Sequence, residues 1–352
     1  MSSQLVKWSI RRSVCRVTIA LCAVLALGQA AARSQGSNSL YGPDGVSPKA
    51  VRQGVLGSCY FHASIAAVAQ AAPDKLRGAI IAIPSGGYRV HFSQGPDEVV
   101  LPEDVEYGRT HSFDRSEGQW VGVLMRAYAQ RAVRLSLAAA IQKSTLIPDF
   151  AKPVAIEWLQ SSGPLLVAYD RAIRSVVNQN GMMDKAAFKQ ALAQQLSTLG
   201  VTGAEAQTMA GFLDEKGFFD ALVLTVDQNG EVFGAYKSMG QGDIPVRVIE
   251  AFMGSARAGF MADQPPLVKQ LQRLHQGGVA LVAGTWGKPP NAQFTVSNWW
   301  VAAHVFTVLD YDESAGTVSL RNPWGTRPAP DGSFTIPLAD FLGAYESYSY
   351  SD

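Results

Sequence analysis

Residues 53–61 read Gln53-Gly-Val-Leu-Gly-Ser-Cys59-Tyr-Phe61, and they lead into the first apolar helix that the sequence predicts. This helix is predicted over residues 58–72, because alanine and larger apolar residues recur there at helical spacing and Pro73 closes the segment. Cys59 falls in its first turn. Backbone N–H groups and the helix dipole stabilise an anion at such a position, so we expect a lowered pKa for the thiol.

Cys59 is the single cysteine that remains once a predicted export signal is removed. Cys15 and Cys22 both lie within that signal, so the mature protein can form no internal disulfide. The chemistry of one thiol is therefore the natural explanation for Cys59. Gly54 and Gly57 permit a tight turn just before it and let the backbone approach a substrate closely.

The amino terminus predicts a signal peptide over residues 1–32. An apolar run at 17–27 is followed by an Ala30-x-Ala32 cleavage pattern, and it is preceded by the basic residues Lys7, Arg11, Arg12 and Arg16. The run is shorter than the roughly 20 apolar residues that span a bilayer, and no later run is longer, so we expect no stable membrane span. The predicted location is periplasmic or extracellular, with residues 33–44 as a linker.

The charge balance excludes a basic nucleic-acid-binding protein. The chain has 30 Lys and Arg residues against 29 Asp and Glu residues, and the predicted signal peptide contains four of the basic residues and none of the acidic ones. The mature chain therefore carries a net charge of about minus three. Its length of about 320 residues is enough for two lobes with proper cores.

The order of predicted elements indicates an α+β fold. A helical first lobe covers residues 45–265 and includes a helical segment at about 132–230, in which the clearest helix is predicted at 184–199. The second lobe, residues 266–352, is mainly antiparallel sheet, because apolar runs alternate there with turn residues. Its predicted strands cover residues 279–285, 301–310, 317–321 and 334–336.

Residues of four kinds in the sequence could support attack of a thiol on a carbonyl. Such attack needs a nucleophile, a base, a group that orients the base, and donors for the oxyanion. Cys59 is the candidate nucleophile, and Gln53 can offer its amide N–H beside the backbone N–H of Cys59. His304 and Asn322 lie in consecutive predicted strands, so Asn322 can accept from the imidazole and fix its tautomer. Trp324 would shield that contact from water.

Four other histidines compete with His304 for the role of base. Structural or surface roles are expected for all of them, namely His62, His91, His111 and His275. His62 would lie one turn inside the helix that begins near Cys59, and His91 sits in a predicted strand. The other two lack an orienting partner in the sequence.

The region around Cys59 resembles the papain-like cysteine proteases. Their motif is Cys-Gly-(Ser/Ala)-Cys-(Trp/Tyr), and residues 57–60 match it as Gly-Ser-Cys-Tyr, with Leu56 in place of the first cysteine. In papain-like proteases that first cysteine pairs in a disulfide. The calpain branch lacks it and has a Gln-Gly-x-x-Gly-Asp-Cys-Trp run, which residues 53–60 resemble closely.

The second half of the chain resembles the calpain family as well. Residues 320–325 look like the calpain signature Leu-Arg-Asn-Pro-Trp-Gly. His304 stands in an Ala-His-Val-Phe-Thr-Val run that is comparable to the family's Gly-His-Ala-Tyr-Ser-Val. Residues 124–129 and 250–254 resemble two further calpain regions.

This similarity covers most of residues 45–352 but not the segment at about 132–230, which we interpret as an insertion in the first lobe. The insertion could enlarge the core or cover the cleft, and the sequence does not decide between the two. Ser58, Tyr60 and Ala303 stand where the family usually has Asp, Trp and Gly. None of these three is a reacting group.

The resemblance implies a papain-like two-lobe fold and a calpain-type cysteine endopeptidase that cleaves protein or peptide substrates through a thioester on Cys59. It assigns catalytic roles to Cys59, His304, Asn322 and Gln53, with Trp324 and Gly57 in support. It also raises calcium as a cofactor, whereas the residues themselves indicate no metal site. Two alternatives stay open: acyl transfer to amines, as in a transglutaminase or transpeptidase, and a catalytically silent binding module.

Overall fold

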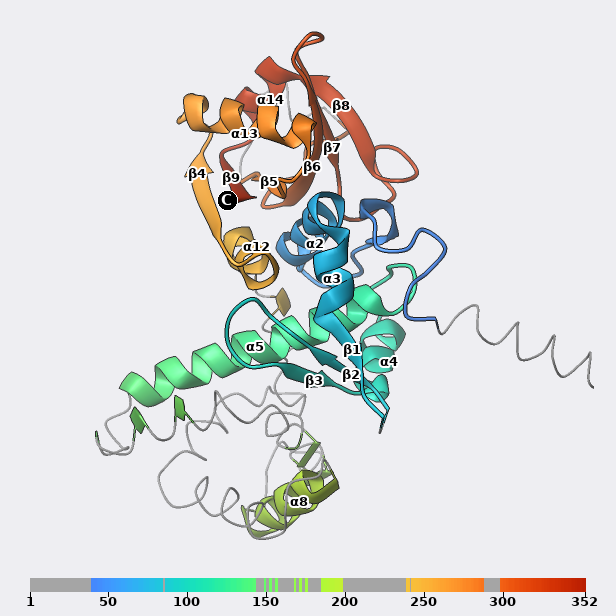
Figure 1. The fold of residues 1–352 in the computed structure, drawn as a ribbon, viewed down its shortest axis with the longest axis vertical. Helices are drawn as coiled ribbons and strands as arrows, with labels where there is room; N and C mark the ends of the chain where they lie inside the picture. Colours follow the sequence, from blue (N-terminus) through green and yellow to red (C-terminus); the bar gives the residue numbers. More distant parts are fainter. Residues whose placement is uncertain are drawn as a thin grey trace, which may run out of the picture.

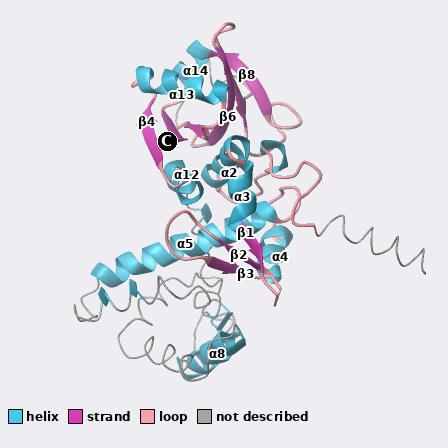
Figure 2. Ribbon diagram, in the orientation of Figure 1, coloured by secondary structure: helices cyan, strands magenta, loops and turns pink. Residues whose placement is uncertain are grey.

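The computed structural model describes residues 39–84, 86–143, 185–198, 242–287 and 298–352, with residues 239–240 and a few positions between 149 and 176. The predicted signal peptide at 1–32 and most of the predicted insertion at about 132–230 lie outside these residues. The described chain combines helices with antiparallel sheets (Figure 2), so the predicted α+β class is confirmed.

The part of the described chain before residue 254 is mostly helical. Its helices are η1 (Pro48–Ala50), α2 (Cys59–Ala71), α3 (Pro73–Ala79), α4 (Pro102–Thr110), α5 (Trp120–Lys143), α8 (Lys185–Thr198) and α12 (Pro245–Met253). Three short strands form a small antiparallel sheet in the order β1 (Ile80–Ala82), β2 (Tyr88–Val90) and β3 (Glu98–Val100).

Helix α2, which begins at Cys59, is buried on almost every side. Ten of its 13 residues are buried, and many of them are alanines, so neighbouring elements can approach it closely. It contacts α12 and strand β6 (Val305–Asp312), which belongs to a large sheet, and Figure 1 shows α2 between that sheet and α5. A helix that is apolar all round is stable only inside a core, so packing fixes the position of α2.

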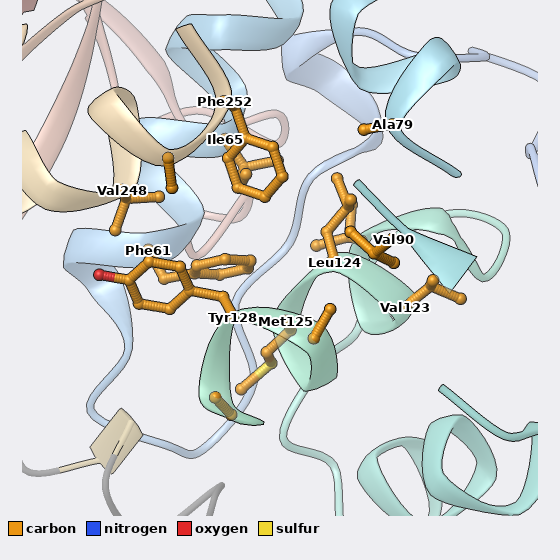
Figure 3. Close-up of a cluster of buried hydrophobic side chains, with 14 of the residues drawn as sticks. Phe61, Ile65, Ala79, Val90, Val123, Leu124, Met125, Tyr128, Val248 and Phe252 are labelled. Carbon is orange, nitrogen blue, oxygen red and sulfur yellow. The ribbon is translucent and has the colours of Figure 1, made fainter. Parts of the chain in front are cut away.

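Figure 3 shows the first hydrophobic core, which holds α2 in place. Phe61 and Ile65 of α2 lie among Tyr128 of α5 and Val248 and Phe252 of α12. The rings of Phe61 and Tyr128 have centroids 5.6 Å apart, within the range of favourable aromatic contact. Helix α8, which matches the helix predicted at 184–199, adds buried side chains to the same core, namely Phe188, Leu192 and Leu196.

A six-stranded sheet in which every pair is antiparallel dominates the rest of the chain. Its order is β4 (Ala256–Phe260), β9 (Ser347–Ser351), β5 (Leu281–Gly284), β6 (Val305–Asp312), β7 (Thr317–Arg321) and β8 (Ser333–Pro337). Helices α13 (Gln264–Gln276) and α14 (Leu338–Ala344) pack with it around a second hydrophobic core. Phe306 of β6 and Phe341 of α14 are fully buried in this core.

The strands predicted at 279–285, 301–310, 317–321 and 334–336 are present as β5, β6, β7 and β8, with shifted ends except for β7. Strands β4 and β9 were not predicted. Because β4 pairs with β9, the large sheet begins at Ala256, before the predicted lobe boundary at residue 266. The helix predicted at 58–72 is confirmed as α2, and Pro73, which closes it, begins α3.

Among the described residues, no helix has both the length and the apolar character that crossing a bilayer requires.

Candidate active site

Cys59 lies at the edge of a cavity of about 530 Å³ that the two parts of the chain line together. The cavity is bounded by residues 53–57, Cys59, Tyr60, Gly240, Gly242, Asp243, residues 301–305 and Trp324. Gln53, Gly57, His304 and Trp324 are therefore around one opening, as their predicted roles require. Asn322 lies directly behind His304.

Strand pairing explains how His304 and Asn322 come together. His304 immediately precedes β6, and Asn322 immediately follows β7. In the antiparallel register of these strands Thr307 pairs with Arg321, so His304 lies opposite Trp324 when the register is extended. Side chains two residues apart share a face, which puts Asn322 on the same side of the sheet as His304.

The imidazole of His304 is held by the amide of Asn322. Nε2 of His304 lies 3.0 Å from Oδ1 of Asn322, and the backbone N–H of Trp324 donates to the same oxygen at 3.0 Å. Two donors on one oxygen fix the orientation of the amide, so Nε2 carries a proton and Nδ1 is left for the cavity. The predicted contact between His304 and Asn322 is thus present.

Trp324 covers this contact, as predicted. Its ring centroid lies 4.7 Å from that of His304, with the planes inclined by 47°. His304 is only 4% exposed and Asn322 only 1% exposed. A hydrogen bond so shielded from water is stronger than an exposed one.

The backbone before His304 is strained at Ala303. Ala303 has a φ of 49°, in the left-handed region that favours glycine. Its N–H donates to the carbonyl oxygen of Trp286, and His304 exchanges backbone hydrogen bonds with Thr285. These bonds hold the imidazole at the cavity and explain why an alanine is tolerated there.

Gln53 lines the cavity, but its amide is already engaged. Nε2 donates to the carbonyl oxygen of Leu56 at 2.6 Å, while Oε1 is buried without a hydrogen-bond partner among the described residues. Nε2 carries a second hydrogen, which this bond does not use. The sequence predicted the donor and did not predict the bond that orients it.

Gly57 permits a close contact within the protein, whereas the predicted approach of this backbone to a substrate stays a prediction. A Cβ atom on Gly57 would lie 2.7 Å from the carbonyl oxygen of Gly240, so no side chain fits there. The loop is also tied to the second half of the chain, because the N–H of Gln53 donates to the carbonyl oxygen of Pro323 at 2.8 Å.

Arg321 is a site residue to which the sequence analysis gave no role. It is 1% exposed, and its Nη2 donates to the carbonyl oxygen of Val51 at 2.7 Å. It therefore joins the end of β7 to the loop that carries Gln53. The feature of the sequence that could have drawn attention to Arg321 is its place directly before Asn322 in the motif at residues 320–325.

Burial shifts the two candidate reacting groups away from their charged forms. It raises the pKa of the Cys59 thiol, although backbone N–H groups of Val305 and Tyr60 act in the opposite direction. Burial lowers the pKa of His304 to about 4, and the hydrogen bond with Asn322 offsets only part of the effect. The expectation of a lowered pKa for the thiol is wrong, because desolvation outweighs the backbone N–H groups at the start of the helix.

The other four histidines do not line the cavity among the residues described. His91 pairs with Asp97 and His275 with Asp310 on the surface, while His111 stacks against Tyr107. His62 lies inside α2 as predicted and is fully buried.

No metal site is visible around these residues. Within the described ranges, no three or more His, Cys, Asp and Glu side chains gather so that they could hold a metal ion. The described residues therefore assign no cluster of such side chains to the calcium that the resemblance raised.

Comparison with known proteins leaves the family unassigned. No family model matches the chain, and no curated protein matches it. Among solved structures, a similar chain is PepW from Lactobacillus rhamnosis HN001 (DR20), with a TM-score of 0.28 and 10% sequence identity over 90% of this chain and 80% of that chain. A TM-score this low carries no argument about fold or function.

Proposed function

We propose that this protein is a cysteine endopeptidase with a papain-like two-lobe fold and a calpain-type catalytic core. The observation that carries the proposal is the meeting of Cys59, from the helical part, with the His304–Asn322 pair, from the sheet, at one cavity. The two separate hydrophobic cores support the two lobes. With the predicted signal peptide, the protease would act on protein or peptide substrates in the periplasm or outside the cell.

The mechanism begins with a proton transfer inside the cavity. The Cys59 proton passes to Nδ1 of His304. Burial opposes the formation of the two charges, and their mutual attraction offsets part of this cost. Backbone N–H groups of Tyr60 and Val305 stabilise the thiolate that results. Asn322 keeps Nε2 protonated and stabilises the imidazolium.

Acylation and deacylation follow with the same groups. The sulfur attacks the peptide carbonyl carbon, and the oxyanion accepts from the Cys59 backbone N–H and from the second amide hydrogen of Gln53. The imidazolium of His304 then protonates the leaving amine, and a thioester remains. His304 next removes a proton from water, which attacks the thioester and releases the acid, and the thiol recovers the proton.

Product analysis tests this function against both alternatives. The protein is incubated with a denatured protein substrate and an excess of a primary amine, and the products are identified by mass spectrometry. We expect new amino and carboxyl termini, and their complete loss in Cys59→Ala with an unchanged circular dichroism spectrum. Amine adducts without cleavage would support acyl transfer instead, and no Cys59-dependent product would support a binding module.

A further inference from the structure

A second segment of chain supports the loop that carries Gln53. Residues 112–117 run antiparallel to residues 50–55, with Gln53 paired to Asp114. Gly54 and Val55 donate their N–H groups to the carbonyl oxygens of Phe113 and Ser112 at 3.1 and 2.8 Å. The position of Gln53 therefore depends on this segment.

His62 connects the supporting segment to helix α2. Its Nε2 lies 3.5 Å from Oδ1 of Asp114, which is long for a hydrogen bond but close for an electrostatic contact in a buried place. Its Nδ1 lies 3.1 Å from Oγ and 3.0 Å from the carbonyl oxygen of Ser58. Both nitrogens of this fully buried ring thus face oxygen atoms.

The same contacts lead on to Gln53. Ser58, the residue before Cys59, donates its backbone N–H to the carbonyl oxygen of Leu56 at 2.8 Å. That oxygen also accepts the bond from Nε2 of Gln53. A continuous path therefore runs from Asp114 through His62 and Ser58 to the carbonyl that orients the oxyanion donor.

Asp114 itself has little freedom to move. Its Oδ1 accepts from the N–H and the hydroxyl of Ser116, and it is 5% exposed. Helix α5 approaches so closely that a Cβ atom on Gly122 would lie 3.2 Å from Oδ2. A buried polar network that restricts its own members also restricts the groups that are bonded to them.

We propose that His62 and Asp114 are positioning residues, which hold the amide of Gln53 in place as a donor to the oxyanion. This inference rests on the proposed function. It assigns the pair no contact with substrate, so the pair acts only on steps that develop an oxyanion.

Two reactions of the same thiol separate this role from a general structural one. Peptide hydrolysis passes through an oxyanion, whereas alkylation of Cys59 by iodoacetamide does not. His62→Leu is expected to lower kcat about tenfold or more while KM and the alkylation rate stay within about twofold, because small misplacement of a donor is costly in rate. His62→Gln, which keeps a polar side chain, should recover part of kcat. Asp114→Asn, which keeps the bonds to Ser116, serves as the second variant if His62→Leu fails to fold.

The dependence on Gln53 is the sharper part of the test. Gln53→Ala should lower kcat by roughly 10²-fold, and adding His62→Leu or Asp114→Asn to it should cause little further loss, because the path acts through Gln53. His91→Leu is the matched control, since His91 forms an exposed pair with Asp97 outside the cavity, and it should leave kcat unchanged.

The outcomes are distinguishable. A wild-type protein that hydrolyses no peptide overturns the proposed function and this inference with it. If the wild type hydrolyses peptide, two results overturn the inference alone. One is an equal loss of kcat from His62→Leu and Asp114→Asn whether or not Gln53 is present. The other is a fall in the alkylation rate that parallels the fall in kcat.

Discussion

At the scale of single residues, the site depends on burial as much as on the choice of side chains. His304 and Asn322 are almost completely enclosed, and Trp324 seals them. Burial raises the pKa of Cys59 and lowers that of His304, so both groups are mainly uncharged at neutral pH. Cys59 and His304 together therefore hold one proton over the whole pH range between the ionisation of His304 and that of Cys59.

This interval predicts the pH dependence of hydrolysis. Activity requires a pair that holds one proton, so it is lost on the acid side only as His304 becomes protonated in the free enzyme, near pH 4. On the alkaline side it persists past the ordinary range of thiol ionisation, because the pKa of Cys59 is raised. We expect kcat/KM for a peptide without titrating groups to be nearly constant from about pH 5 to pH 8. An acid limb centred near pH 6.5 would show that burial does not control His304.

The residues of the site could be predicted to different degrees. Cys59, His304 and Asn322 are recognisable because each reacting group needs a particular side chain in a particular local sequence. His62, Asp114 and Arg321 were given no part in holding the site together, because their contacts are with partners far away in the chain. The hydrogen bond from the Gln53 amide to the carbonyl oxygen of Leu56 could not be predicted either, because it forms only in the folded loop.

At the scale of elements, segments with a strong local pattern were easier to predict than segments that depend on distant partners. The alanine-rich apolar run of α2 predicts a helix directly, whereas β9 has the sequence Ser-Tyr-Ser-Tyr-Ser, with no β-branched residue. It is a strand because β4 and β5 pair with it on either side. Gly259 of β4 makes room for the ring of Tyr348, since a Cβ atom there would lie 2.6 Å from it. Pairing of this kind is not visible in local sequence.

Arg321 links two elements, and its removal should loosen the site. Arg321→Met breaks the bond to Val51 and leaves that carbonyl buried without its charged donor. We expect the free energy of unfolding to fall by about 1–3 kcal/mol, with a lower kcat, as measured by urea unfolding and peptide hydrolysis. Arg257→Met is the control, because Arg257 forms an exposed pair with Asp352 that should contribute less than about 1 kcal/mol. Equal effects of the two substitutions would contradict the linking role of Arg321.

At the scale of the whole molecule, the candidate site lies where the two hydrophobic cores adjoin. The nucleophile helix belongs to the first core, and the strands that carry His304 and Asn322 border the second. The α+β class could be predicted from the sequence. The sheet begins earlier in the chain than predicted, because β4, which lies before residue 266, pairs with β9. The way in which the cores come together depends on contacts such as that of α2 with β6, which join distant parts of the chain.

The central claim is that Cys59 is an activated nucleophile served by His304. The most direct measurement is reaction of the mature protein with an epoxide inhibitor of cysteine proteases, read as intact mass, with added calcium and with a chelator. We predict a single adduct on Cys59 that is lost in His304→Ala, and the two conditions reveal any dependence on calcium. Absence of an adduct under both conditions, or an equal adduct in His304→Ala, would contradict the claim.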